Sequence, residues 1–102
     1  MTLARKELPI PPGAIDAPEG FEIARVWIAE GKQHVSLMTD IWEGPAAWGI
    51  ILVDLAKHVA DSYDKRGAFA IADALSRIKD GFDAEWAQSI DEPTGDFLDE
   101  SS

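Results

Sequence analysis

Gly31 lies between two runs of alternating apolar and polar residues, and this pattern constrains the fold more than any other feature. Glycine supplies the positive φ that a type II′ turn requires at its first central position, so we expect a two-residue turn at Gly31-Lys32. In this register one face of the ribbon carries the apolar residues Val26, Ile28, Val35 and Leu37. The other face carries Arg25, Trp27, Ser36 and Met38. Because a one-residue slip would destroy this sorting, the sequence predicts an antiparallel hairpin over residues 21–39.

A helix over residues 18–31 is the alternative, with Pro18 near its start and Gly31 just after its end. The segment is rich in β-branched and aromatic residues, which favours strands. We therefore prefer the hairpin, and another strand can extend it, since two strands alone are marginally stable in water.

Two later segments show apolar residues at helical spacing. Residues 45–66 carry a stripe of Trp48, Ile51, Leu52, Leu55, Val59 and Tyr63. Residues 69–88 carry a second stripe of Ile71, Leu75, Ile78, Phe82 and Trp86. Asp40 and Glu43 have the spacing of a capping box before the first helix, and Gly67 is expected to end it. The expected fold class is therefore α+β, with the hairpin packed against two helices that cover its apolar face.

The 102 residues are expected to form one domain with an extension at each end. Residues 1–20 contain four prolines and two glycines, so we expect an extended N-terminal arm. Residues 89–102 hold five acidic residues and no basic one, which is half of the net charge of −10. We expect this segment to be a disordered acidic tail. The α+β domain then spans residues 21–88.

The composition argues against several classes of function. The chain has no cysteine, so disulfides, thiolate metal sites and cysteine nucleophiles are excluded. A net charge of −10 repels phosphate groups, which argues against nucleic acids and membranes as partners. No apolar run approaches the ~20 residues of a membrane span, and the N-terminus lacks the apolar segment of a secretory signal. The sequence contains no glycine-rich phosphate-binding loop, so we expect no cofactor. We therefore expect a cytoplasmic protein.

The two histidines, His34 and His58, are the residues with which a catalytic site would be built. A hydrolytic site would combine one of them with a carboxylate and a nucleophile, for which the candidates are Asp40, Asp54, Ser36 and Ser62. These spacings match no nucleophile motif, and two histidines without an H-x-x-x-H pair are a weak signal for metal. Asp54 and His58 also fit an ordinary helical i,i+4 pair. We therefore assign no catalytic, cofactor-binding or metal-binding residue.

Several phrases of the sequence resemble a known family: ELPIPP, GKQHVSL, EGPAAWG, LAKHVA and GFDAEW, spread over residues 7–86. Together they are similar to a family of bacterial proteins of about this length, domain-of-unknown-function family 5076. The resemblance covers nearly the whole expected domain and leaves out the acidic tail. It implies no activity and no catalytic residue, because the family has none assigned that could be transferred.

The function expected from the sequence is that of a non-enzymatic interaction or structural module in the form of a homodimer. The edges of a hairpin need a partner or a cover, and Trp27 lies on the face opposite the apolar one. We expect Trp27, Met38 and Trp42 at the dimer interface. Two alternatives remain. One is a small-molecule enzyme that uses His34 or His58 with a nearby carboxylate, and the other is an acidic inhibitor of a basic nucleic-acid-binding protein.

Overall fold

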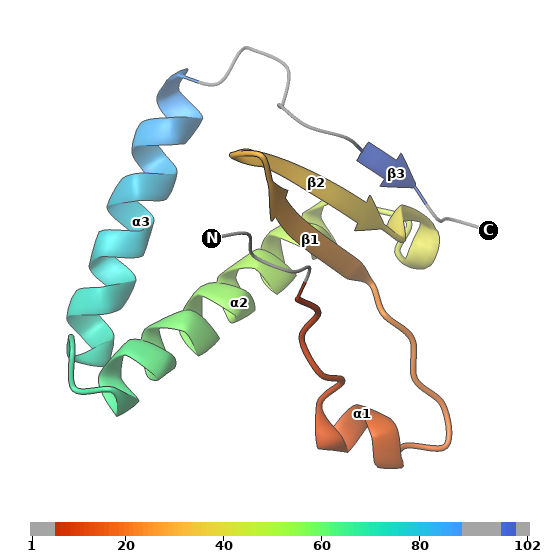
Figure 1. Ribbon diagram of the computed structural model, residues 1–102. Helices are drawn as coiled ribbons and strands as arrows, with labels where there is room; N and C mark the ends of the chain where they lie inside the picture. Colours follow the sequence, from red (N-terminus) through yellow and green to blue (C-terminus); the bar gives the residue numbers. More distant parts are fainter. Residues whose placement is uncertain (1–5, 89–96, 100–102) are drawn as a thin grey trace.

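The structure is a computed structural model of the chain, and it describes residues 6–88 and 97–99. In chain order its elements are helix α1 (Pro12–Asp16), strands β1 (Ala24–Ala29) and β2 (Lys32–Leu37), a 3-10 turn (Thr39–Ile41), helices α2 (Ala46–Lys65) and α3 (Ile71–Gln88), and strand β3 (Phe97–Asp99). A hairpin, two long helices and a further strand form an α+β arrangement, which confirms the fold class expected from the sequence (Figure 1).

The hairpin turns at Glu30-Gly31, one residue earlier than expected. Both residues have positive φ, 54° and 73°, which is the signature of a type I′ turn. Val26 therefore lies opposite Val35 and not opposite Leu37. The expected register is wrong by two residues, because glycine suits the second central position of a type I′ turn as well as the first position of a type II′ turn. A shift of two residues keeps every side chain on its expected face.

Strand β3 forms within the tail for which the sequence predicts disorder. It pairs in parallel with β2 in a register that places Leu37 opposite Asp99, and Thr39 Oγ1 donates a hydrogen bond of 2.6 Å to Asp99 Oδ2. Backbone pairing of this kind does not depend on the acidic composition of the segment, which is why composition gave no sign of the strand. The sheet order is β1-β2-β3, so β1 is an edge strand. The rest of the tail lies outside the described residues.

The N-terminal arm contains a short helix where the sequence predicts extended chain. Helix α1 begins at Pro12, whose missing N–H and fixed φ suit the first turn of a helix. The carbonyl of Pro11 accepts hydrogen bonds from the amides of Ala14 and Ile15, at 2.9 Å and 3.1 Å. The prolines therefore start a single helical turn at this place.

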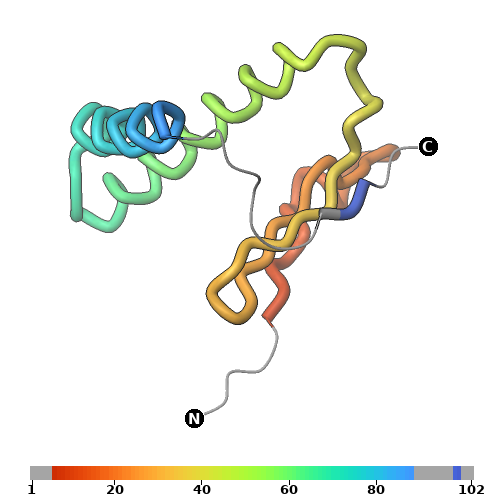
Figure 2. The backbone as a smooth tube through the Cα atoms, turned by 90° about the horizontal axis from the view of Figure 1, so that it is seen from above, coloured from red at the N-terminus to blue at the C-terminus, as the bar shows by residue number. Residues whose placement is uncertain are grey.

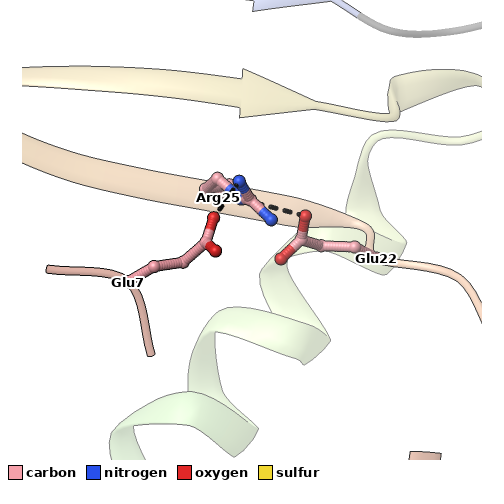
Figure 3. Close-up of polar contacts among 3 residues, drawn as sticks. All are labelled: Glu7, Glu22 and Arg25. Carbon is pink, nitrogen blue, oxygen red and sulfur yellow. Dashed lines mark hydrogen bonds and ion pairs between the residues drawn. The ribbon is translucent and has the colours of Figure 1, made fainter. Parts of the chain in front are cut away.

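An arginine of the sheet connects the arm to β1. The guanidinium of Arg25 binds the carboxylate of Glu7 at 2.6 Å and that of Glu22 at 3.1 Å (Figure 3). All three side chains are about half exposed, so each ion pair contributes only about 0–1 kcal/mol to stability. The pairs fix the direction of the arm more than they stabilise the fold.

Helix α2 begins after Pro45 without a capping box. Pro45 occupies the N-cap position, and no side-chain hydrogen bond caps the helix. The capping-box prediction is wrong because Asp40 lies in the 3-10 turn, and the helix starts only after the Gly44-Pro45 pair. The predicted end is confirmed: Gly67 has a φ of 74°, and its amide donates a hydrogen bond of 2.9 Å to the carbonyl of Asp64.

The two long helices meet at their connecting loop and diverge away from it, and the sheet lies in a separate layer (Figures 1 and 2). Among the described residues only Ala60 on α2 and Ala74 on α3 are buried, at 0% and 3% exposure. The tightest packing is therefore between the helices, close to the loop that joins them. Two buried alanines are a very small core for a chain of 102 residues.

Candidate functional site

Large apolar side chains at the surface are the main feature of the molecule. Within residues 6–88 and 97–99, sixteen of them are at least 36% exposed, whereas no large side chain is fully buried. Single apolar residues at a surface are normal, but contiguous ones mark a place where something binds. The candidate site is therefore a surface and not an enclosed cavity.

Helix α2 carries the first part of this surface. Trp48, Leu52, Leu55 and Val59 follow one another at spacings of four, three and four residues, which places them on one face. Leu52 and Leu55 are each 52% exposed and Val59 is 46% exposed. These residues belong to the stripe that the sequence predicts to be buried. We call these four residues the α2 stripe.

Helix α3 carries the second part. Near its C-terminal end Phe82 and Trp86 stack with their ring centroids 5.6 Å apart, and they are 51% and 72% exposed. Ile71, on the same face at the other end of the helix, is 42% exposed. A stacked aromatic pair with this much exposed surface is unusual, because aromatic rings gain most when both faces are covered.

Between the two parts lies an open groove of about 590 Å³, at the N-terminal end of α2 and the C-terminal end of α3. We call it the wedge, and it is lined by Pro45, Ala46, Trp48, Gly49, Leu52, Phe82, Asp83 and Trp86. Asp83 is the one charged residue that lines it, and its carboxylate already binds Lys79 Nζ at 2.7 Å on the same helix. The hydrogen bond with Asp83 raises the pKa of Lys79. The wedge therefore presents apolar surface with few polar groups to orient a small substrate.

The joint between the sheet and α2 contributes a second aromatic pair. Trp42 and Trp48 lie edge to face, with their ring centroids 5.5 Å apart. The indole Nε1 of Trp48 is buried and has no hydrogen-bond partner in the described part of the chain. Buried donors of folded proteins are almost always paired, so this one costs free energy in the folded chain.

The residues that the sequence predicts at a dimer interface lie elsewhere. Trp27, Met38 and Trp42 are each half-buried, whereas Val26 and Ile28 on the other face of β1 are 57% and 71% exposed. The sequence predicts the opposite, namely that the helices cover the face of Val26 and Ile28. The interface at Trp27, Met38 and Trp42 stays a prediction, and the exposed side chains of α2 and α3 form a second candidate. Helical periodicity identified those side chains but not their exposure.

The two histidines lie on different elements. His34 on β2 is half-buried, and its Nε2 donates to the carbonyl of Ala29 at 3.3 Å. His58 is exposed on α2, and within the described ranges it makes no hydrogen bond to a serine or a carboxylate. The candidate catalytic partners of the histidines lie on three elements: Asp40 in the 3-10 turn, Asp54 and Ser62 on α2, and Ser36 on β2. Ser36 is half-buried, and the other three are exposed.

The described part of the chain offers neither a metal site nor a membrane-spanning helix. In residues 6–88 and 97–99 no group of three or more histidine and acidic side chains is arranged to hold a metal ion. None of the helices in that part of the chain has the length and apolarity needed to cross a bilayer.

These observations define the class: a small α+β domain with a thin core and a large apolar surface on its helical hairpin. Over residues 7–90 the chain matches the family described as domain of unknown function (DUF5076), and it belongs to this family. The resemblance seen in the sequence is thereby confirmed.

One solved structure is similar to this chain over almost its whole length. It comes from the photosynthetic bacterium Rhodopseudomonas palustrus CGA009 and is described provisionally as a pyruvate dehydrogenase. The sequence identity is 31% and the TM-score is 0.67, and the similarity covers 91% of this chain and 95% of that chain. A comparison with the curated proteins finds no match.

Proposed function

We propose that the protein is a non-enzymatic interaction module whose folded unit is a homodimer. The observation that carries this proposal is the near absence of a core within one chain, where Ala60 and Ala74 are the buried apolar residues of the described ranges. A domain of this size normally gains its stability from one contiguous apolar core. A second copy would supply the missing cover. The cytoplasmic location expected from the sequence belongs to the same proposal.

Exposed apolar side chains support the proposal. Within residues 6–88 and 97–99, sixteen large apolar side chains are at least 36% exposed, and none is fully buried. Full burial of a large apolar side chain is worth about 1.5–3 kcal/mol relative to leaving it exposed. Association with a second copy would therefore stabilise the folded chain.

A catalytic role is the second candidate, because the similar structure is described provisionally as a pyruvate dehydrogenase. Pyruvate is an anion, and a site for it needs a positive group or several backbone amides. The wedge is lined by one acid and by no basic side chain, and the chain carries a net charge of −10. The electrostatics therefore favour the interaction module. A role as an acidic inhibitor is also less favoured, because half of the net charge lies in residues 89–102 and not on the helices.

Sedimentation equilibrium over a wide range of protein concentrations tests the proposal. We expect a mass of twice 11.1 kDa at micromolar concentration, and a melting temperature that rises with protein concentration. A cooperative thermal transition at a constant mass of 11.1 kDa would show that one chain folds alone, and the proposal would then be wrong. Oxidation of pyruvate by the purified protein with an added electron acceptor, lost in His34→Ala or His58→Ala, would favour the enzyme instead.

A further inference from the structure

We infer that the α2–α3 hairpin is the surface through which two copies associate. The α2 helices of the two copies pack antiparallel, stripe against stripe, and the C-terminal half of each α2 fills the wedge of the other copy. The assembly is then a layer of four helices around a two-fold axis. This inference rests on the proposed homodimer and assigns its interface.

The spacing of the α2 stripe fits such a pairing. Apolar residues separated by four, three and four residues are the pattern of helices that pack lengthwise against one another at a small angle. The middle of the stripe lies between Leu52 and Leu55. In an antiparallel pair around that point, Leu52 of one copy faces Leu55 of the other, and Trp48 faces Val59. The stripe is therefore self-complementary, as a two-fold interface requires.

The wedge supplies the room for the second copy. The helices α2 and α3 diverge away from their loop (Figure 1), and Trp48 and Trp86 both line the wedge between them. An antiparallel α2 of the second copy brings its C-terminal half to this place. Phe82 and Trp86 would then cover that helix with their exposed faces.

The net charge of the α2–α3 hairpin is small enough to let two copies of it approach each other. Residues 46–88 contain seven acidic and five basic side chains, so they carry −2 of the chain's −10. Three of the acids are paired within their own helix, in the ion pairs Asp61–Lys65, Asp73–Arg77 and Lys79–Asp83. The helical hairpin therefore carries only a small part of the net charge, whereas residues 89–102 alone carry −5.

The exposed area is sufficient for a specific interface. Six side chains provide it, namely Leu52, Leu55, Val59, Ile71, Phe82 and Trp86, with exposures between 42% and 72%. At about 100 Å² each, judged from the 150–250 Å² that an aromatic side chain can bury, they offer about 600 Å² per copy. A standard interface needs ~800 Å² per partner, so neighbouring side chains and backbone need to add only about a quarter.

Cross-linking is the direct test, because the chain has no cysteine and each engineered thiol is the only one. Leu55→Cys lies in the middle of the stripe, Lys57→Cys lies nearly opposite on the same helix, and Ile28→Cys lies on the exposed face of β1. With a short bismaleimide we expect Leu55→Cys to give severalfold more covalent dimer than either control. Two results would show that the α2–α3 interface is wrong although the protein is a homodimer. One is a higher yield of covalent dimer from Ile28→Cys than from Leu55→Cys, and the other is an equal yield from all three variants in a protein of dimeric mass.

A polar substitution adds an equilibrium measurement. Leu55→Gln keeps nearly the same helix propensity, and Lys57→Gln is its matched control. We expect Leu55→Gln to raise the dimer dissociation constant about 30-fold or more, as for a hot-spot residue, while Lys57→Gln leaves it within a few-fold. An unchanged constant for Leu55→Gln would overturn the inference. If Leu55→Gln loses its helical circular dichroism, the cross-linking result decides alone. A monomeric mass for the unmodified protein would contradict the proposed function itself.

Discussion

The two ends of the α2–α3 hairpin use similar residues in opposite ways. At the closed end, near the loop, Tyr63 and Phe69 lie edge to face at 5.8 Å, and Ala60 and Ala74 are buried. At the open end the aromatic residues are again paired, but Trp86 is 72% exposed. The closed end thus holds the buried residues of the described part of the chain, whereas the open end is the more exposed of the two.

Arginines make the contrast sharper. The guanidinium of Arg66 lies 4.5 Å from the ring centre of Tyr63, and that of Arg77 lies 4.8 Å from the ring centre of Phe69. Cations over aromatic faces cover the rings and leave charge at the surface, which suits a permanently solvated end. In the wedge the one charged lining residue is Asp83, which is an acid and is paired with Lys79 along α3. The two ends therefore differ in how their aromatic rings are covered, as the proposed dimer requires.

The largest effect is expected from overpacking the closed end. Ala60 is fully buried, so Ala60→Leu forces side-chain atoms between helices that already touch, and we expect a loss of about 1–3 kcal/mol in the free energy of unfolding. Urea titration at fixed protein concentration measures it. Ala72→Leu, at an exposed alanine of α3, is the matched control and should change stability by less than ~0.5 kcal/mol. Equal effects of the two substitutions would show that the closed end is no more tightly packed than the surface.

The aromatic contacts at the closed end should contribute nearly as much. Phe69→Ala removes the ring that contacts Tyr63 and lies under Arg77. We expect a loss of about 2 kcal/mol, less than for a fully buried phenylalanine because this one is 36% exposed. The measurement is the urea midpoint, with Phe69→Leu as the variant that keeps apolar volume and should lose less. If Phe69→Ala lost less stability than Phe69→Leu, the arginine–aromatic contacts would not stabilise the loop.

The sequence predicted the helices well, because each carries a long stripe and ends at a recognisable residue. The expected segments 45–66 and 69–88 differ from α2 and α3 by at most two residues at either end, and Gly67 stops α2 as expected. The hairpin was also predictable, but its register was not, because Gly31 is compatible with two turn types. Strand β3 pairs through its backbone across a long stretch of sequence, and no local pattern indicates that.

The candidate site shows a different limit of sequence reasoning. Periodicity identified Leu52, Leu55 and Val59 as residues that avoid water, and this is a property of the residues themselves. Whether the cover comes from the same chain or from another copy depends on how the helices and the sheet are placed relative to one another. That placement is set by the short joint between β2 and α2, whose Trp42–Trp48 contact has no signature in the sequence. The stripe was predictable, but its exposure was not.

A smaller effect, of opposite sign, is expected midway along α3. Gly81 lies inside the helix, and a Cβ added there would meet nothing within 4 Å. Gly81→Ala should therefore raise the free energy of unfolding by about 0.5–1 kcal/mol, because alanine restricts the unfolded chain and favours helix. The contrasting variant is Gly67→Ala, where the φ of 74° makes alanine strained and a loss is expected. A loss from Gly81→Ala as well would show that a neighbouring chain approaches α3 at this position.

The smallest effect concerns the ion pairs on the outer sides of the helices. Hydrogen bonds with Asp61 and Asp83 raise the pKa values of Lys65 and Lys79 above the ordinary 10.5. A lysine whose pKa is higher in the folded state stabilises that state below pH 10.5, and this contribution is lost as the pH rises through the raised value. Both lysines are exposed, so the contribution is small. The double variant Asp61→Asn/Asp83→Asn removes the pairing, so the unmodified protein should be the more stable of the two at about pH 9. The difference should fall as the pH rises above 10.5 and through the raised pKa values of the two lysines. Urea titrations of both proteins across this range measure the difference. A difference that stays constant over the whole range would assign it to helix propensity and not to the ion pairs.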